Sequence, residues 1–227
     1  MRQLAIGLLS TIVAALFAGG SGGATAGFAP RVDNPWFPLI PGTTWVYRGV
    51  KDGKAARDVV TVLHATKTIQ GVRCTSVSDR LYLAGRLEER TTDWYAQDRR
   101  GNVWYFGEAT ATYDERGHIE SKEGSWKAGR GGAVAGKIMP AHPRITDAYR
   151  QEYYRGHAED QAWIVQRNAH TTVPYGTLHH LVRSFEWTRL EKKVLSLKLY
   201  APGLGIVREK DMSGGSESFV LVSVHHH

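Results

Sequence analysis

Cysteine is almost absent from this chain, and that absence excludes one class of protein. The 227 residues include a single cysteine, Cys74, so no disulfide can form within the chain and a small disulfide-stabilised scaffold is excluded. Helical periodicity is also scarce. After residue 30 the best helix candidate is the short segment 158–168, and its Ile164–Val165 pair also suits a strand. With 42% hydrophobic and 22% charged residues, the chain is neither disordered nor collagen-like.

Signatures of catalysis and of metal binding are missing as well. The sequence has no G-x-S-x-G nucleophile elbow, no P-loop and no strand–G-x-G-x-x-G–helix unit. Its internal histidines are scattered and match no ligand spacing such as H-E-x-x-H. We therefore predict no metal ion and no cofactor, although distant histidines that converge in the fold would escape this reasoning.

Clustering of positive charge is absent despite a formal net charge of +7. A nucleic-acid-binding protein concentrates lysine and arginine on one face or element, whereas here they are spread along the chain. We predict no nucleic-acid partner. Weak association with an acidic cell-envelope surface remains an alternative use of the charge.

The N-terminus has the pattern of a secretory signal. Arg2 precedes the apolar run Leu4–Phe17, and a small-residue stretch ends in Ala24-Thr25-Ala26, an A-x-A cleavage pattern. The run of about 14 residues is shorter than the roughly 20 that span a bilayer. We predict a signal peptide over 1–26, a secreted or periplasmic protein, one domain over 27–224, and a remnant of a purification tag at 225–227.

Turn signals recur at short spacing and indicate an all-β fold. They separate segments rich in Val, Thr, Tyr and Trp, and they lie at 51–54, 70–71, 84–85, 99–102, 115–117 and 174–176. This pattern is typical of consecutive antiparallel hairpins, about ten to twelve strands in all. We predict an antiparallel β-barrel, or a strongly curved half-barrel sheet, with little helix.

Two segments interrupt this pattern. Residues 124–143 contain five glycines and two prolines, which predicts a long loop that acts as a lid, binding loop or mobile segment. Residues 34–41 contain three prolines beside Trp36 and Phe37, so they cannot form a central strand. We expect them to pack across one end of the barrel as a plug, before a first strand over 43–47.

The strand predicted at 86–95 carries the most informative pattern, because neither of its two faces is apolar. It is either an edge strand with both faces in water, or a strand with one face lining a polar cavity. In the second interpretation Arg86, Glu88 and Arg90 form a charge ladder on the outer face. Glu89, Asp93 and Tyr95 then point inward, into a ligand site.

A second polar constellation lies at 147–160. It holds three tyrosines, two arginines, His157 and four carboxylates within fourteen residues. A histidine beside carboxylates can act as a general acid or base, because its pKa is near neutral. A solvated turn with surface ion pairs is the alternative interpretation.

Four segments together carry a resemblance: 34–39 with 42–47, 93–98 with 101–108, 149–160, and Tyr200-Ala-Pro-Gly-Leu-Gly-Ile-Val207. They resemble a family of uncharacterised secreted bacterial proteins, especially from actinobacteria. The last segment also looks like the closing hairpin of β-rich envelope proteins with half-barrel folds. The resemblance implies an exported β protein and implies no catalytic residue.

These observations lead to three hypotheses of function. The first is a secreted protein that binds a small amphipathic or aromatic ligand in a barrel cavity, through Glu89, Asp93, Tyr95, Trp104, Glu108, Glu152, Tyr153 and His157. The second is an enzyme on the same scaffold, with Glu152 or His157 as general base and Tyr153 as a proton donor. The third is an interaction protein of the cell envelope that uses the 124–143 loop as its contact surface.

Overall fold

The computed structural model describes residues 27–227, so the predicted signal peptide lies outside the described residues. The described chain contains fifteen β-strands and no helix. The strands are β1 Thr43–Lys51, β2 Lys54–Ile69, β3 Val72–Leu83, β4 Arg86–Gln97, β5 Val103–Tyr113, β6 Ile119–Ser121, β7 Trp126–Lys127, β8 Val134–Met139, β9 Ala148–Arg150, β10 Glu152–Tyr153, β11 Asp160–Val173, β12 Gly176–Thr188, β13 Leu195–Ala201, β14 Gly205–Ser213 and β15 Ser218–His226. The all-β prediction is confirmed.

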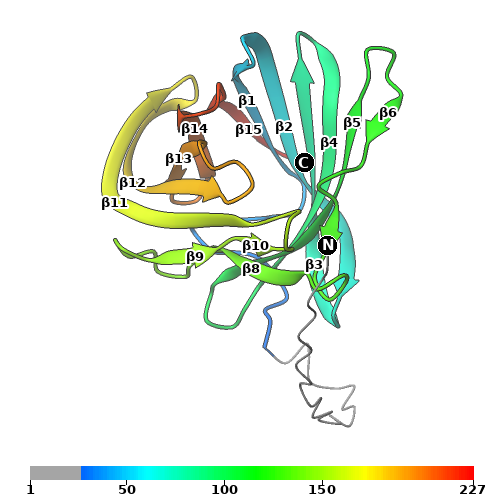
Figure 1. Ribbon diagram of the computed structural model, residues 1–227. Helices are drawn as coiled ribbons and strands as arrows, with labels where there is room; N and C mark the ends of the chain where they lie inside the picture. Colours follow the sequence, from blue (N-terminus) through cyan, green and yellow to red (C-terminus); the bar gives the residue numbers. More distant parts are fainter. Residues whose placement is uncertain (1–26) are drawn as a thin grey trace, which may run out of the picture.

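The strands form one antiparallel sheet that curls into a nearly closed barrel (Figure 1). The order is β10-β8-β5-β4-β3-β2-β1-β15-β14-β13-β12-β11-β9, so β1 pairs with β15 and joins the two halves of the chain. The two ends of the sheet meet where the chain passes from β9 to β10. There the backbone N–H of Gln151 donates to the carbonyl of Asp160 at 2.8 Å.

The predicted turns connect the long strands. Asp52–Gly53, Gln70–Gly71 and Ala84–Gly85 all have positive φ at both residues. This geometry belongs to the two-residue hairpin turn whose twist matches that of the flanking strands. These turns set the register of β1 to β4, and that register decides which side chains face into the barrel.

Three details of the prediction are wrong. There are fifteen strands rather than ten to twelve, because β6, β7, β9 and β10 have only two or three residues, too few to show a pattern. The helix candidate 158–168 belongs largely to β11. The segment 124–143 is not one long loop, since β7 and β8 lie within it and both pair with β5. Its Gly136 is required, because a Cβ there would lie 2.3 Å from the backbone of Gln151.

The segment before β1 closes one end of the barrel, as predicted. Phe37 packs edge-to-face on Tyr95, with 5.3 Å between ring centroids. Asn34 is 2% exposed, and its amide donates to the carbonyls of Gly101 and Pro140 at 2.8 and 3.1 Å. The backbone N–H of Gly203, in the β13–β14 turn, donates to the carbonyl of Pro35 at 2.7 Å. These bonds fix an aromatic floor beneath the barrel.

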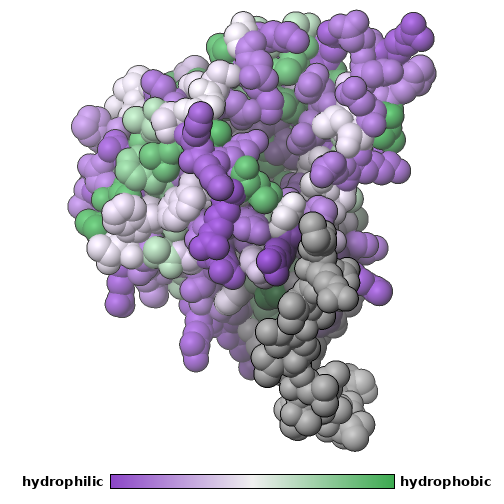
Figure 2. Space-filling model, in the orientation of Figure 1, coloured by the Kyte–Doolittle hydropathy of each residue, from purple (hydrophilic) through white to green (hydrophobic). Residues whose placement is uncertain are grey.

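The outside of the barrel is polar. In Figure 2 hydrophilic residues cover most of the visible face, and apolar residues are scattered among them. No helix within 27–227 is long and apolar enough to cross a membrane. The last strand continues through His226, which pairs with Thr43, so it extends two residues beyond the domain end predicted at 224.

Candidate ligand-binding cavity

A cavity of about 340 Å³ lies inside the barrel. Its floor is apolar and is formed by the plug, the start of β1, the end of β4, β8 and the β13–β14 turn, through Phe37, Pro38, Trp45, Tyr95, Ile138 and Leu204. Trp45 and Tyr47 have no free donor. The Trp45 indole N–H donates to the carbonyl of Leu204 at 2.8 Å, and the Tyr47 hydroxyl donates to that of Ile206 at 3.0 Å. Both rings therefore present apolar surface to the cavity.

One wall of the cavity is acidic, and strand register explains why. Asp58 on β2 lies opposite Leu81, Asp79 on β3 lies opposite Val60, and Asp93 on β4 lies opposite Val77. Each acid is thus displaced by two residues from the acid on the next strand. Diagonal neighbours on one face of a sheet remain within reach of each other. All three line the cavity, together with Glu89.

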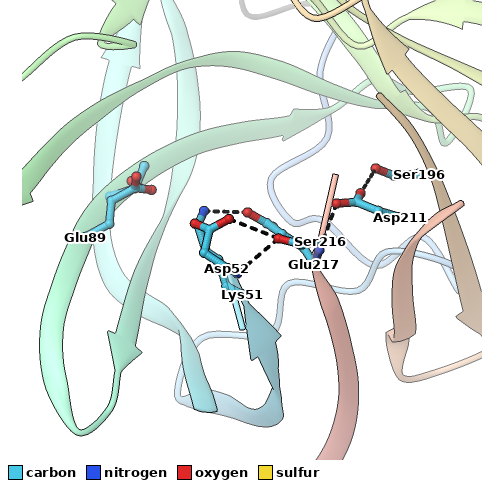
Figure 3. A network of polar contacts seen from close by, with 8 residues as sticks. Lys51, Asp52, Glu89, Ser196, Asp211, Ser216 and Glu217 are labelled. Carbon is cyan, nitrogen blue, oxygen red and sulfur yellow. Dashed lines mark hydrogen bonds and ion pairs between the residues drawn. The ribbon is translucent and has the colours of Figure 1, made fainter. Parts of the chain in front are cut away.

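The mouth of the cavity carries a salt bridge. Lys51 Nζ, at the end of β1, lies 2.5 Å from Glu217 Oε1, just before β15. The neighbouring turn is fastened by Ser216, whose hydroxyl donates to Asp52 Oδ1 at 2.9 Å. Figure 3 shows this network, with Glu89 on a separate strand of the wall. Lys51, Glu89 and Glu217 all line the cavity.

The wall formed by β12, β13 and β14 holds a half-buried lysine. Lys198 Nζ lies 3.1 Å from Glu186 Oε2 and 3.5 Å from Glu209 Oε1. The hydroxyls of Ser184 and Tyr200 both donate to Glu186 Oε1 at 2.8 Å. Although burial disfavours the Glu186 carboxylate, the Lys198 charge and these hydrogen bonds hold its pKa below the usual value. Lys198 and Glu186 therefore form an ion pair.

The carboxyl groups of the acidic wall behave in the opposite way. Burial, followed by the charge of Asp79 and a hydrogen bond with it, raises the pKa of Asp58 well above its usual value. Burial likewise raises the pKa of Asp79 and of Glu89, and it raises the pKa of Asp93 to about 8. Tyr105 donates to Asp93 Oδ1 at 2.6 Å, which opposes that rise without cancelling it. Asp93 therefore retains its proton near neutral pH.

A second acidic cluster lies beside this wall, on β5 and β10. Glu108 is directly opposite Asp93 on β5, and Glu152 Oε2 accepts a hydrogen bond from the Trp126 indole at 2.9 Å. Burial, then the charge of Asp93, raises the pKa of Glu108 to about 9. Burial, then the charge of Asp160, raises the pKa of Glu152 to about 8. Neither side chain lines the cavity.

The structure divides the predicted site residues among four places. Glu89, Asp93 and Tyr95 line the barrel cavity, and β4 is an interior strand rather than an edge. Glu108 and Glu152 form the cluster beside it. Trp104 and Tyr153 line a separate, open groove beside Lys137, Tyr149 and Arg150. His157 is exposed and stacks on Tyr154, with 4.4 Å between ring centroids.

Sequence reasoning missed most of the cavity lining. Asp58, Asp79, Lys198, Glu209 and the aromatic pair Trp45 and Tyr47 were not among the predicted residues. The sequence does contain a signal that could have identified Lys198 and Glu209 as lining residues, because each is a charged residue within a strand of the barrel. Within 27–227 no group of three or more His, Cys, Asp or Glu residues is arranged to hold a metal ion.

The chain matches no family model and no curated protein sequence. Among solved structures it is similar to a "putative exported protein with YmcC-like fold" from Bacteroides fragilis, at 15% identity and a TM-score of 0.48, over 88% of this chain and 100% of that one. It is also similar to a "putative lipoprotein" from Parabacteroides distasonis, at 12% identity and a TM-score of 0.45, over 85% of this chain and 99% of that one. Neither similarity indicates what this chain binds.

Proposed function

We propose that this chain is an exported protein, secreted or periplasmic, that binds a small amphipathic or aromatic ligand inside its barrel. The observation that carries the proposal is the cavity of about 340 Å³, with an aromatic floor and a polar mouth. Ligand pockets in proteins usually have volumes of about 300–1,000 Å³ and combine apolar walls with a few polar groups. Export is supported by the signal pattern over 1–26 and by the resemblance to secreted bacterial proteins.

The enzymatic alternative has less support. It requires Glu152 or His157 to act with Tyr153 on a bound substrate. The Glu152 carboxylate bonds to the Trp126 indole, whereas His157 stacks on Tyr154 in an exposed turn. A general base must lie within hydrogen-bond reach of the proton that it removes. Neither side chain lines the barrel cavity, where a substrate would bind.

Native mass spectrometry of the protein recovered from its own secretion route tests the proposal. We expect a chain that begins at Gly27 and carries a retained small molecule. The variant Val60→Phe fills the cavity, because Val60 lines it, and should lose the molecule. The matched control Val50→Phe changes a valine that is 44% exposed, and should retain it. A chain without any retained molecule, or equal retention by both variants, would contradict ligand binding in the cavity.

A further inference from the structure

We infer that the ligand of this cavity is an organic cation, an ammonium group carried on an apolar or aromatic body. The inference rests on the proposed function, since it assumes that the barrel cavity is the ligand site. It follows from the charges, the hydrogen-bonding groups and the shape of the cavity, which are considered in turn.

The cavity has an excess of carboxyl groups. Six of them line it against two amines: Asp58, Asp79, Glu89, Asp93, Glu209 and Glu217, with Lys51 and Lys198. Both amines are already engaged, Lys51 with Glu217 and Lys198 with Glu186 and Glu209. Within the described chain, Asp58, Asp79, Glu89 and Asp93 have no salt bridge to a basic side chain. The acidic wall thus lacks a cation.

Asp58 has no side-chain hydrogen-bond partner within the described chain except the Asp79 carboxyl group. Its Oδ1 is buried, and no N–H group or hydroxyl of the described chain donates to it. Buried polar atoms in proteins are almost always hydrogen-bonded, and leaving one unsatisfied is costly. An ammonium group brings up to three donors as well as the missing positive charge. It would satisfy Asp58 and still reach Asp79, the diagonal neighbour on β3.

The remaining polar groups of the cavity do not suit an anion. The Trp45 indole N–H and the hydroxyls of Tyr47 and Tyr200 all donate to acceptors of the protein itself. Lys198 is held by two carboxylates. An anionic ligand would therefore meet no unpaired amine, and its donors would be limited to hydroxyl groups such as those of Tyr95 and of protonated Asp93. The exposed faces of the floor aromatics, in contrast, attract a cation as well as an apolar body.

The cation is organic rather than a metal ion. No group of residues within 27–227 is arranged to ligate a metal, and the four carboxyl groups are spread over three strands. A cavity of about 340 Å³ would leave most of its volume empty around a metal ion, and its floor offers no oxygen ligands. An aromatic or aliphatic body fits that floor while the ammonium group lies against the wall.

Binding of a cation should release protons. The titratable groups that face the acidic wall come from every strand packed around it: Tyr47 and Lys51 on β1, Asp58 on β2, Asp79 on β3, Glu89, Asp93 and Tyr95 on β4, Tyr105 and Glu108 on β5, Lys198 and Tyr200 on β13, Glu209 on β14 and Glu217 before β15. Burial raises the pKa of all four wall carboxyl groups, and a bound positive charge favours their ionised form. The affinity for a cation should therefore increase between pH 6 and pH 8.

Three probes with the same aromatic body test the charge. Isothermal titration calorimetry at pH 6, 7 and 8 compares 2-phenylethylamine, which is an ammonium ion at these pH values, with neutral 2-phenylethanol and anionic 3-phenylpropionate. We expect the amine to bind at least about tenfold more tightly than the alcohol, because a charge-assisted hydrogen bond has that effect. The acid should bind most weakly. The amine should release protons, seen as a heat that depends on the buffer's ionisation enthalpy.

Substitutions in the wall separate ligand contact from a structural role. Asp58→Asn and Asp79→Asn should each weaken amine binding about tenfold or more while the circular dichroism spectrum and thermal midpoint show an intact fold. Glu88→Gln is the control, because Glu88 is an exposed carboxylate on the outer face of β4, beside Glu89. It should leave amine binding unchanged.

The outcomes that overturn this inference differ from those that overturn the proposed function. Equal or tighter binding of the alcohol or the acid, sensitive to Val60→Phe, would show that the cavity is a ligand site without preference for cations. A retained natural molecule that lacks a basic group would do the same. If no probe binds and no retained molecule is found, both the inference and the proposed function are wrong.

Discussion

Asp93 gives the sharpest test of the acidic wall, because its pKa sets the sign and size of a stability change. The side chain is 8% exposed, and its pKa rises from an ordinary 3.8 to about 8 in the folded protein. Between those pH values the unfolded chain has released this proton and the folded protein has kept it. Folding stability therefore falls as the pH rises through this window, by about 1.4 kcal/mol per pH unit.

At pH 7 the effect of this single carboxyl group amounts to about 4 kcal/mol of lost stability. Asp93→Asn removes the titrating proton. The Asn carbonyl can still accept the hydrogen bond from Tyr105, which is 2.6 Å long in the parent protein, and Glu108 lies directly opposite as an acceptor for the new amide. We therefore expect the variant to be more stable than the parent at pH 7, by up to about 4 kcal/mol.

Urea unfolding at pH 4, 5, 6, 7 and 8 measures this prediction. The stability of the parent should fall with pH more steeply than that of Asp93→Asn, and the two should approach each other near pH 4. Glu88→Gln, on the exposed outer face of β4, should reproduce the parent profile. Equal slopes for the parent and Asp93→Asn, or a variant destabilised at every pH, would contradict a raised pKa of Asp93 in the folded protein.

Three further predictions concern the fold around the cavity. Asn34→Ala removes a buried amide that donates to two carbonyls and accepts from the Trp36 N–H. Urea unfolding should therefore show that the free energy of unfolding falls by about 3 kcal/mol. A fall of less than about 1 kcal/mol would mean that these hydrogen bonds do not hold the plug in place. Gly107→Ala should lower the thermal midpoint strongly, because φ is +130° and a Cβ would lie 2.3 Å from the Trp126 carbonyl. Gly117 also has positive φ but faces open space, so Gly117→Ala should lower the free energy of unfolding by only about 1 kcal/mol. Burial raises the pKa of the Cys74 thiol to about 12, so an aromatic disulfide reagent at pH 8 should modify it only after unfolding, and rapid reaction of the native protein would contradict this.

The elements that could be predicted from the sequence are those whose signal is local. Two-residue turns such as Asp52–Gly53 require positive φ, which few residue pairs tolerate, so they mark hairpins reliably. The alternation in 86–95 lacked an apolar face, and strand geometry left two interpretations, of which the structure shows the one with Glu89, Asp93 and Tyr95 inward. The prolines of 34–41 likewise excluded a strand and indicated the plug.

The cavity wall escaped prediction because its signal is not local. Asp58 and Asp79 are each a single acid next to an arginine, Arg57 and Arg80, and in the sequence such a pair suggests a solvated strand end. Their proximity depends on the register between β2 and β3, which includes an irregularity between Val62 and Thr66. No single strand carries that information.

Proximity in the sequence does not give proximity in the fold at 149–160. Glu152 and His157 are five residues apart, but a tight turn separates them, in which the N–H of His157 donates to the carbonyl of Tyr154 at 2.8 Å. The pairing of β10 with β8 places Glu152 next to Trp126, while the turn places His157 in solvent. A strand of two residues gives no periodicity from which this could be read.

In the proposed site the same carboxyl groups destabilise the fold and supply the contacts for a cation, and this opposition provides a test of their role. A purely structural acid is destabilising to remove, because its partners lose hydrogen bonds. An acid of this wall has no basic partner, so its amide variant should be as stable as the parent or more so at neutral pH, yet bind an ammonium ion less well. A ligand that binds only the folded state adds stability in proportion to the logarithm of its concentration over its Kd. Binding a cation would thus compensate for the cost of burying the wall. A single substitution that raises the free energy of unfolding and also weakens ammonium binding would be a result that packing alone does not produce.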